Sequence, residues 1–349
     1  MSTRPLPAGV LCALFAALLF GASTPFAKAL LGTTEPWLLA GLLYLGSGTG
    51  LFIYRRISRP APTTLSGSDK AWLAGAIVAG GVVGPALLML GLSSMPASGA
   101  SLLLNAEGVF TALLAWFVFK ENFDRRIALG MALIVAGTVV LSWPGEADFG
   151  SALPALAVLG ACLAWGLDNN LTRKVSLNDA TFIAMAKGLI AGATNIALAL
   201  AAGAHFPSAG ALAGSAALGF LSYGVSLVLF VVALRALGTA RTGAYFSTAP
   251  FAGALLALFM LGEPITAQLV MAGLLMAAGV WLHLTEHHHH RHTHRALRHE
   301  HAHVHDEHHR HAHDADMNPG EPHVHAHAHD PMTHDHSHYP DTHHRHEHP

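Results

Sequence analysis

The sequence predicts an all-α membrane protein with ten transmembrane helices in two inverted five-helix repeats, followed by a disordered His-rich tail. Three observations lead to this fold class. Hydrophobic residues make up 52% of the 349 residues and fall into long runs, while charged residues make up only 11%, against about 25% in soluble domains. Lys and Arg gather in alternate loops, and the second half of the chain repeats patterns of the first.

The composition combines two unlike parts. Of the 27 His, 25 lie in the tail Glu286–Pro349, together with 5 basic and 11 acidic residues. Residues 1–285 hold 14 basic and 10 acidic residues, so the net charge of −2 conceals a mildly basic apolar body and an acidic tail. This distribution argues against a soluble enzyme, and the lack of a basic face argues against nucleic-acid binding. Cys12 and Cys162 lie in apolar runs and indicate no disulfide framework.

Apolar runs of about 18 or more residues predict membrane helices, because about 20 residues cross the hydrocarbon layer of about 30 Å. The first run is too long for a cleaved signal peptide and is followed by further spans. Ten runs reach or approach the required length: residues 9–31, 36–54, 71–92, 98–119, 127–143, 153–172, 180–204, 211–234, 239–261 and 265–284.

The basic residues predict which loops face the cytoplasm, since cytoplasmic loops are enriched in Lys and Arg. With a cytoplasmic N-terminus, the loops expected outside contain no Lys or Arg: Gly32–Glu35, Ser93–Ala97, Pro144–Ala152, His205–Gly210 and Gly262–Pro264. We therefore expect a multi-pass protein of the inner cell membrane with both termini in the cytoplasm. The tail then lies in the cytoplasm as well.

The two halves of the chain repeat each other. Phe20–Lys28 aligns with Trp165–Arg173, and Leu104–Phe110 aligns with Phe246–Ala252 at nearly the same offset. Because each half has five spans, an odd number, the second half enters the membrane from the opposite side. Many secondary transporters use such an inverted repeat to build a site near the bilayer midplane.

Both repeats open with an aromatic residue followed by Gly, and both end their fourth span in a characteristic run. These patterns are Phe20-Gly21, Trp165-Gly166, Glu107-Gly108-Val109-Phe110 through Lys120-Glu121, and Ala249-Pro250-Phe251 through Leu261-Gly262-Glu263-Pro264. In them the chain resembles EamA-type permeases of the drug/metabolite transporter superfamily. The resemblance divides the chain into a first repeat at 9–143, a second repeat at 153–284 and the tail at 286–349.

The resemblance implies a secondary transporter that exports or exchanges small metabolites or drugs, and not an enzyme. The chain departs from the family pattern at two positions. Gly108 stands where the family often has Pro, and Ala249 stands where a Glu is frequent. An acidic function would therefore rest on Glu107 of the first repeat. The fold alone names no substrate.

Ionisable side chains inside membrane spans are costly to bury, so they are candidates for function. Glu107 lies about ten residues into the fourth span, near the midplane at about 1.5 Å per residue. It is expected to carry a proton or bind a cation, with a static ion pair or an interhelical hydrogen bond as the alternative. Asp168 and Lys187 both lie toward the cytoplasmic side and could pair, which would make both structural. We expect Lys28 to reach the outer interface with its long side chain.

Neutral polar residues occupy matching places in the two halves, and we expect them to line a cavity or to form interhelical hydrogen bonds. Phe20, Trp165 and Tyr245 are candidates for the same cavity or for packing. The predicted substrate or coupling residues are Glu107, Asn105, Asp168, Asn169, Lys187, Ser23, Thr24 and Ser247.

The tail is predicted to bind divalent metal ions, because its His alternate with small residues and neutral imidazole suits Zn, Ni, Cu and Co. Its lack of Cys disfavours Cu(I) and tight structural zinc. A low-complexity solvating tail that binds metal incidentally is the alternative. The candidate ligands are His299, His301, His303, His305, His323, His325, His327 and His329.

Two functional hypotheses follow. The first is a secondary-active exporter of a divalent transition metal, nickel or cobalt, or of a metal chelate, with a tail that binds Ni, Co or Zn. The second is a general small-metabolite or amino-acid exporter with a regulatory or incidental tail, because the spans hold no His in support of a bare metal site. Neither needs a cofactor. The expected partners are the lipid bilayer and a small-molecule or metal-ion substrate, without nucleic acid, and a homodimer is compatible with both.

Overall fold

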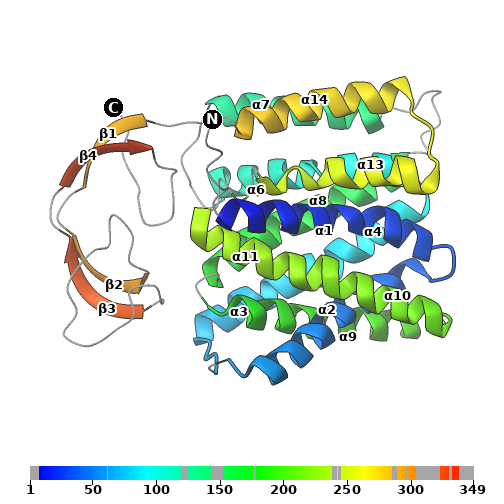
Figure 1. The fold of residues 1–349 in the computed structure, drawn as a ribbon, viewed down its shortest axis with the longest axis horizontal. Coiled ribbons are helices and arrows are strands. Elements are labelled where there is room, and N and C mark those ends of the chain that lie inside the picture. The colour runs from blue at the N-terminus through cyan, green and yellow to red at the C-terminus, as the bar shows by residue number, and fades with distance from the viewer. Residues whose placement is uncertain are drawn as a thin grey trace, which may run out of the picture. The chain divides into compact units, whose positions relative to one another are not determined.

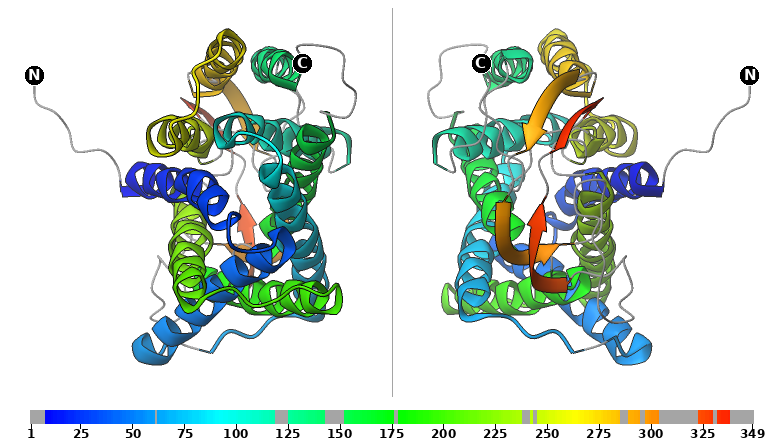
Figure 2. Two further views of the ribbon diagram at one scale, coloured as in Figure 1. Left: turned by 90° about the vertical axis from the view of Figure 1, so that its right-hand side faces the viewer. Right: turned by 90° about the vertical axis from the view of Figure 1, so that its left-hand side faces the viewer.

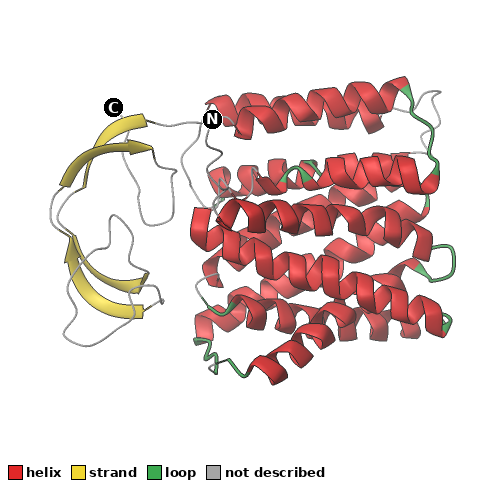
Figure 3. Ribbon diagram, viewed as in Figure 1, coloured by secondary structure: helices red, strands yellow, loops and turns green. Residues whose placement is uncertain are grey.

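The computed structural model describes residues 8–60, 62–118, 125–142, 152–175, 178–237, 242, 245–284, 289–294, 297–303, 323–329 and 332–337. The chain divides into two compact units, Met1–Glu286 and His287–Pro349. The described part of the first unit is helical (Figure 3). Its helices lie side by side along a common direction (Figure 1).

The helices of the first unit follow the predicted spans closely. In the first half they are α1 (Ala8–Leu30), α2 (Pro36–Ser58), α3 (Gly67–Ala76), α4 (Gly84–Ser93), α5 (Ala97–Leu103), α6 (Ala106–Phe117) and α7 (Arg125–Ser142). In the second half they are α8 (Ala152–Val175), α9 (Ala180–Ala201), α10 (Ala209–Gly219), α11 (Ser226–Leu237), α13 (Ala249–Leu261) and α14 (Ala267–Leu284).

Seven described helical stretches are long and apolar enough to cross a membrane, and three of them join helices that are continuous or nearly so. The seven are Ala8–Leu30, Pro36–Ser58, Gly67–Ser93, Ala97–Leu114, Ala152–Val175, Ala180–Ala201 and Ala209–Ala233. Three shorter apolar helices, Ala128–Val140, Ala249–Leu261 and Ala267–Leu282, lie within the predicted fifth, ninth and tenth spans. The protein is thus a multi-pass helical membrane protein.

Local sequence explains where several helices begin and end. Ser66 and Asp69 form a reciprocal capping box at the start of α3, which satisfies two free backbone N–H groups. The Asp179 carboxylate accepts hydrogen bonds from the amides of Thr181 and Phe182 at the start of α9. Helix α13 ends where Gly262 adopts a φ of 63°, a left-handed conformation that favours glycine.

Helices from the two halves pack against each other in pairs. Helix α2 lies against α9, α7 against α14, α1 against α13 and α11, and α8 against α4 and α6 (Figures 1 and 2). The α2–α9 contact depends on glycine, because a Cβ added to Gly188 would lie 2.4 Å from the backbone nitrogen of Gly48. Small residues at such crossings let two backbones approach closely.

Two π-helical segments interrupt the long helices, at Ile77–Val83 between α3 and α4 and at Phe220–Val225 between α10 and α11. Just after the first segment, Pro85 of α4 has no N–H to offer to the carbonyl of Gly81. The amide of Gly84 donates to the carbonyl of Ala79, which leaves the carbonyl of Gly80 without its α-helical donor. The adjacent carbonyls of Gly80 and Gly81 therefore both lack their α-helical donors.

The described residues of the second unit form two antiparallel strand pairs, which differ from the predicted disorder. Strand β1 (His289–His294) pairs with β4 (Met332–Ser337), and β2 (Leu297–His303) pairs with β3 (His323–His329). Alternation of His with small residues permits an extended backbone whose polar groups pair across the ladder. In β2 and β3 the register places His299 opposite His327, His301 opposite His325, and His303 opposite His323.

Candidate functional site

A cavity of about 80 Å³ lies among helices of both halves, with aromatic, hydroxyl, amide and charged side chains in its wall. One water molecule needs about 10–15 Å³ of such space, so the cavity has room for several water molecules or a small chemical group. The lining residues are Phe20, Tyr44, Ser47, Glu107, Trp165, Asp168, Asn169, Ala184, Lys187, Gly188, Ser222, Tyr223, Ser226, Leu227, Phe230 and Phe246.

Glu107 lies in the first turn of α6, where the helix dipole favours a negative charge. The Asn169 side-chain amide on α8 donates to Glu107 Oε1 at 2.8 Å and also lies 3.2 Å from the Thr111 hydroxyl. Asn170 donates to the Thr111 carbonyl at 3.1 Å. These bonds fix α6 against α8 and hold the Glu107 carboxylate at the cavity by means of a neutral donor.

Asp168 and Lys187 form a buried ion pair, which is one of the alternatives that the sequence left open. Lys187 Nζ donates to Asp168 Oδ1 at 2.6 Å and to Oδ2 at 2.7 Å. The Thr172 hydroxyl donates to Asp168 Oδ1 at 2.8 Å. Neither side chain of the pair is more than 8% exposed. The pair is therefore internally compensated, and it leaves Glu107 as the cavity carboxylate whose described hydrogen-bond partner is neutral.

Gly80 is required for this arrangement. A Cβ at position 80 would lie 1.9 Å from Asp168 Oδ2. The carbonyl of Gly80, released by the π-helical segment, accepts from the Tyr44 hydroxyl at 2.7 Å and from Trp165 Nε1 at 2.9 Å. The carbonyl of Gly81 accepts from the Asn195 side-chain amide at 2.8 Å. Side chains of three other helices thus satisfy the carbonyls that the π-helical segment frees.

Aromatic rings form one continuous cluster around the cavity. The ring of Phe20 lies 6.0 Å from that of Trp165, 5.8 Å from that of Tyr223 and 5.4 Å from that of Phe246, between centroids. Phe230 lies 4.7 Å from Phe246. Electron-rich ring faces attract organic cations, so the aromatic cluster and the Glu107 carboxylate favour the same class of ligand.

The structure brings together four of the eight predicted substrate or coupling residues, since Glu107, Asp168, Asn169 and Lys187 all line the cavity. Ser23 and Thr24 are buried in α1, and Ser247 lies just before α13. The Asn105 amide donates to the Leu102 carbonyl at 3.1 Å, and its side-chain oxygen has no partner. The role of each of the eight residues stays a prediction.

Most of the aromatic and hydroxyl side chains that line the cavity were not predicted from the sequence. Phe20 and Trp165 were candidates, but Tyr44, Phe230 and Phe246 were not, and neither were the hydroxyl residues Ser47, Ser222, Tyr223 and Ser226. The available signal was a polar residue inside an apolar span, as at Ser47 and Ser222. That signal does not tell whether a hydroxyl faces a cavity or bonds its own backbone.

Among the side chains that the structure describes, no three from His, Cys, Asp and Glu come together as a metal ion would need. Of the eight predicted tail ligands, His305 lies outside the described residues. The other seven lie in β2 and β3, where the structure gives their backbone positions. Metal binding by the tail therefore stays a prediction.

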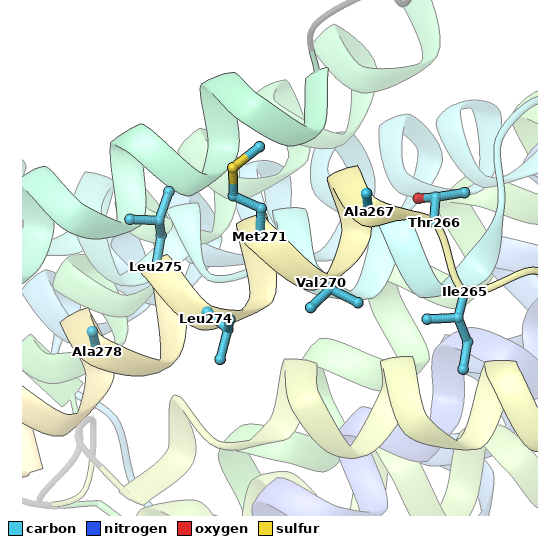
Figure 4. A pocket seen from close by; sticks show the side chains of 8 residues that line it. All are labelled: Ile265, Thr266, Ala267, Val270, Met271, Leu274, Leu275 and Ala278. Carbon is cyan, nitrogen blue, oxygen red and sulfur yellow. The ribbon is translucent and has the colours of Figure 1, made fainter.

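A larger hollow of about 590 Å³ is open and lies along α14 (Figure 4). Its lining is apolar apart from Thr266, and three of the side chains are 47–68% exposed: Val270, Met271 and Leu274. An exposed apolar surface on a membrane helix is compatible with lipid. We therefore assign the candidate site to the cavity whose wall contains Glu107, Asp168 and Lys187.

The loop between α4 and α5 is held by one charge from each half of the chain. Lys28 donates to the carbonyls of Leu92 at 2.7 Å and Met95 at 2.9 Å. Glu263 accepts from the amides of Ala97 at 2.7 Å and Ser98 at 2.9 Å. Opposite charges thus satisfy the end of α4 and the start of α5. Glu121, the repeat partner of Glu263, lies outside the described residues.

Replacing Glu263 by Ala is expected to lower the free energy of unfolding by about 1 kcal/mol, the typical cost of a lost helix N-cap. Thermal unfolding of the purified protein in detergent measures the change. Glu35→Ala is the matched control, because Glu35 precedes α2 but makes no side-chain capping bond. An equal effect of the two substitutions would show that charge, and not capping, is responsible.

A second link between the halves joins the end of α2 to the start of α9. Arg55 Nη1 lies 2.6 Å from Asp179 Oδ2 and also donates to the Thr181 hydroxyl. Burial alone would raise the pKa of Asp179, but hydrogen bonds from Thr181, Arg55 and the Phe182 amide outweigh it and hold the pKa below its ordinary value. The link is therefore strongest when Asp179 is ionised.

This shift predicts a dependence of stability on pH. Because the pKa of Asp179 is lower in the folded protein than in the unfolded chain, its contribution is complete above the unfolded value of about 4. It is lost as the pH falls through the folded pKa. We expect Asp179→Asn to flatten the loss of stability below about pH 4, measured by unfolding in a pH series. Arg55→Gln should flatten it as well, whereas a wild-type response in either variant would contradict the assignment.

The fold and the cavity together define a class of protein, namely a multi-pass helical membrane protein with ionisable side chains in a cavity among its spans, as transporters have. Residues 7–143 and 152–285 match the EamA-like transporter family, and the chain belongs to that family. Membership points to transport of a small molecule across a lipid bilayer rather than to an enzyme.

The chain is similar to proteins that are named as transporters. An uncharacterized transporter of Methanothermobacter thermautotrophicus is 28% identical over 294 residues, which cover 78% of this chain and 85% of the relative. A probable amino-acid metabolite efflux pump of Salmonella typhimurium is 35% identical over 85 residues, or 23% of this chain and 27% of the relative. One solved crystal structure covers 80% of this chain and 99% of its own, with a TM-score of 0.63 at 18% identity, and this likeness shows the fold alone.

Proposed function

We propose that this protein is a secondary-active exporter of a small organic metabolite that carries a cationic amino group, which it exchanges for protons at Glu107. The proposal rests on how the three ionisable side chains that line the cavity are paired. Asp168 is neutralised by Lys187, whereas Glu107 is held by the neutral amide of Asn169 in a wall rich in aromatic rings. An intramembrane carboxylate of this kind is a natural carrier of a proton or a cation.

We also propose that the protein has ten spans in two inverted repeats, and that it lies in the inner membrane with both termini in the cytoplasm. Equivalent segments of the two halves support the repeat. The π-helical segments start at Ile77 and Phe220, and helices α6 and α13 start at Ala106 and Ala249. The two members of each pair are separated by the same number of residues. The loop distribution of Lys and Arg supports the orientation. Export is supported by the Salmonella relative, which is named a probable amino-acid metabolite efflux pump.

The first hypothesis from the sequence, export of nickel or cobalt, gains no support from the described part of the cavity. Its ionisable members are two carboxylates and a lysine, and Lys187 already occupies Asp168. Nickel and cobalt bind well to imidazole nitrogen, and the described cavity wall has no His. The cavity therefore fits an organic amine better than a bare metal ion.

Flux into proteoliposomes tests the proposal. With the protein reconstituted and a pH gradient imposed, we expect amine-bearing solutes, including amino acids, to move against their own gradient and to release protons in exchange. Neutral solutes and Ni²⁺, Co²⁺ or Zn²⁺ should move no faster than in protein-free vesicles. If only the metal ions are transported, or if no amine in the panel is, the proposal is wrong.

For the tail we propose a separate role, the binding of divalent metal ions by His299–His305 and His323–His329. The register of β2 and β3 supports it, because three His of one strand stand opposite three of the other. We expect the full chain to bind Ni²⁺ or Zn²⁺ at about pH 7.5 and to release it below about pH 6, as imidazole is protonated. Calorimetry against a chain that ends at Glu286 measures this, and equal binding by both chains would exclude the tail.

A further inference from the structure

The cavity contains two tyrosines whose rings touch but whose hydroxyl groups have different surroundings. The ring centroids of Tyr44 and Tyr223 lie 5.2 Å apart. Both residues line the cavity, and they are 8% and 7% exposed. They come from different helical stretches, Tyr44 from α2 and Tyr223 from the π-helical segment Phe220–Val225. The roles of the two tyrosine hydroxyl groups can therefore be compared within one site.

The hydroxyl of Tyr44 already donates its single hydrogen within the protein. It donates to the carbonyl of Gly80 at 2.7 Å, and Trp165 Nε1 donates to the same oxygen at 2.9 Å. A carbonyl oxygen has two lone pairs, so these two donors complete it. Since the π-helical segment leaves this carbonyl without an α-helical donor, Tyr44 and Trp165 stabilise the altered helix. Tyr44 acts as a positioning residue.

The hydroxyl of Tyr223 is buried and has no hydrogen-bond partner in the structure. The Ser23 hydroxyl lies near it without reaching hydrogen-bonding geometry. Buried hydroxyl groups are nearly always paired, and one left unpaired is unfavourable. A ligand that brings an acceptor oxygen into the cavity would remove this penalty. No comparable gain is available at Tyr44, whose hydroxyl is already bonded.

The position of Tyr223 in the repeat supports this difference. Tyr223 is the counterpart of Gly80, because each is the fourth residue of its π-helical segment. At this place the first half has a glycine, which admits Asp168, and the second half has a phenol. Helix α8 carries Asp168 and Asn169, and α6 carries Glu107. Tyr223 thus lines the cavity from a different helical stretch than the two carboxylates do.

We infer that Tyr223 donates a hydrogen bond to a carboxylate or carbonyl oxygen of the transported solute, while Glu107 binds its amino group. The inference rests on the proposed function and narrows it. The solute carries both a cationic amine and an acceptor oxygen, as an amino acid does, and Tyr223 selects it over an amine that has no such oxygen.

Alanine and ethylamine test the inference, because they differ by one carboxylate. Proton-coupled exchange of each is measured in proteoliposomes with wild type, Tyr223→Phe, Tyr44→Phe and Ser23→Ala. We expect Tyr223→Phe to raise the KM for alanine about 10-fold or more, the range for a lost hydrogen bond to a charged group. Its KM for ethylamine should rise by a much smaller factor, because ethylamine has no acceptor oxygen for Tyr223. Tyr44→Phe should instead lower kcat for both solutes and leave KM nearly unchanged.

Several outcomes would overturn the inference. It is wrong if Tyr223→Phe handles alanine as wild type does, if it affects both solutes equally, or if wild type transports ethylamine but not alanine. In the last case the proposed function still stands. If wild type transports neither solute, the proposed function fails for this pair and the inference fails with it. If Tyr223 only bonds Ser23, then Tyr223→Phe and Ser23→Ala should lower thermal stability equally with no change in KM, which also contradicts it.

Discussion

Replacing Glu107 by Gln is expected to abolish proton-coupled exchange and to weaken binding of a cationic solute by about 10- to 100-fold. The amide keeps the size of the side chain and can still accept a hydrogen bond from Asn169, which lies 2.8 Å from Glu107 Oε1. It cannot lose or gain a proton or balance a positive charge. A hydrogen bond to a charged group contributes about 1.5–3 kcal/mol, and each step of about 1.4 kcal/mol corresponds to about tenfold in affinity.

Two measurements separate the parts of this prediction. Proton release on addition of solute reports coupling, and solute counterflow without a pH gradient reports binding and conformational change. Asn169→Ala is the control, since it removes the donor to Glu107 but keeps the carboxylate. We expect that variant to retain coupling with a reduced rate. Normal proton release by Glu107→Gln would exclude Glu107 as the coupling residue.

Neutralising one member of the Asp168–Lys187 pair is expected to destabilise the fold far more than neutralising both. Lys187→Met leaves the Asp168 carboxylate in a site where its side chain is only 8% exposed. Breaking a buried pair in this way typically costs about 3–5 kcal/mol. The double variant Asp168→Asn with Lys187→Met removes both charges and should unfold at a temperature closer to that of wild type than either single variant does.

The comparison needs expression and thermal unfolding in detergent of wild type, both single variants and the double variant. The Thr172 hydroxyl lies 2.8 Å from Asp168 Oδ1. It can still pair with the side-chain amide that Asp168→Asn introduces, so that position keeps one partner in the double variant. An additive loss in the double variant would mean that the two charges do not stabilise each other. That result would also remove the reason for treating Glu107 as the uncompensated cavity carboxylate.

The sequence predicted the helices well because apolar length is a strong signal in a membrane protein. Positions of α1, α2, α8 and α9 follow it within a few residues. The pairing of Asp168 with Lys187 could also be predicted, since both are costly to bury and lie toward the same side. The π-helical segments could not, although Gly80, Gly81 and Pro85 mark the first of them. The carbonyls of Gly80 and Gly81 are bound by the side chains of Tyr44, Trp165 and Asn195, which lie on three other helices.

The contacts of Lys28 could not be predicted from the sequence either. We expected Lys28 to reach the outer interface because its side chain is long and charged. The sequence did not indicate that it would donate to the carbonyls of Leu92 and Met95. The free hydroxyl of Tyr223 is likewise invisible in the sequence, because an unpaired group is defined by what surrounds it. In the tail, alternation of His with small residues was compatible with paired strands as well as with disorder.

The loop between α4 and α5 is bound by Lys28 from the first half and by Glu263 from the second half. These contacts have a consequence for how the chain folds. The free amides at the start of α5, in the first half, are satisfied by Glu263 from the far end of the second half. Synthesis therefore delivers a first half that is chemically incomplete until nearly the whole membrane unit has emerged. The two halves therefore depend on each other for folding, because the start of α5 gains its partner only when Glu263, just before α14, has been made.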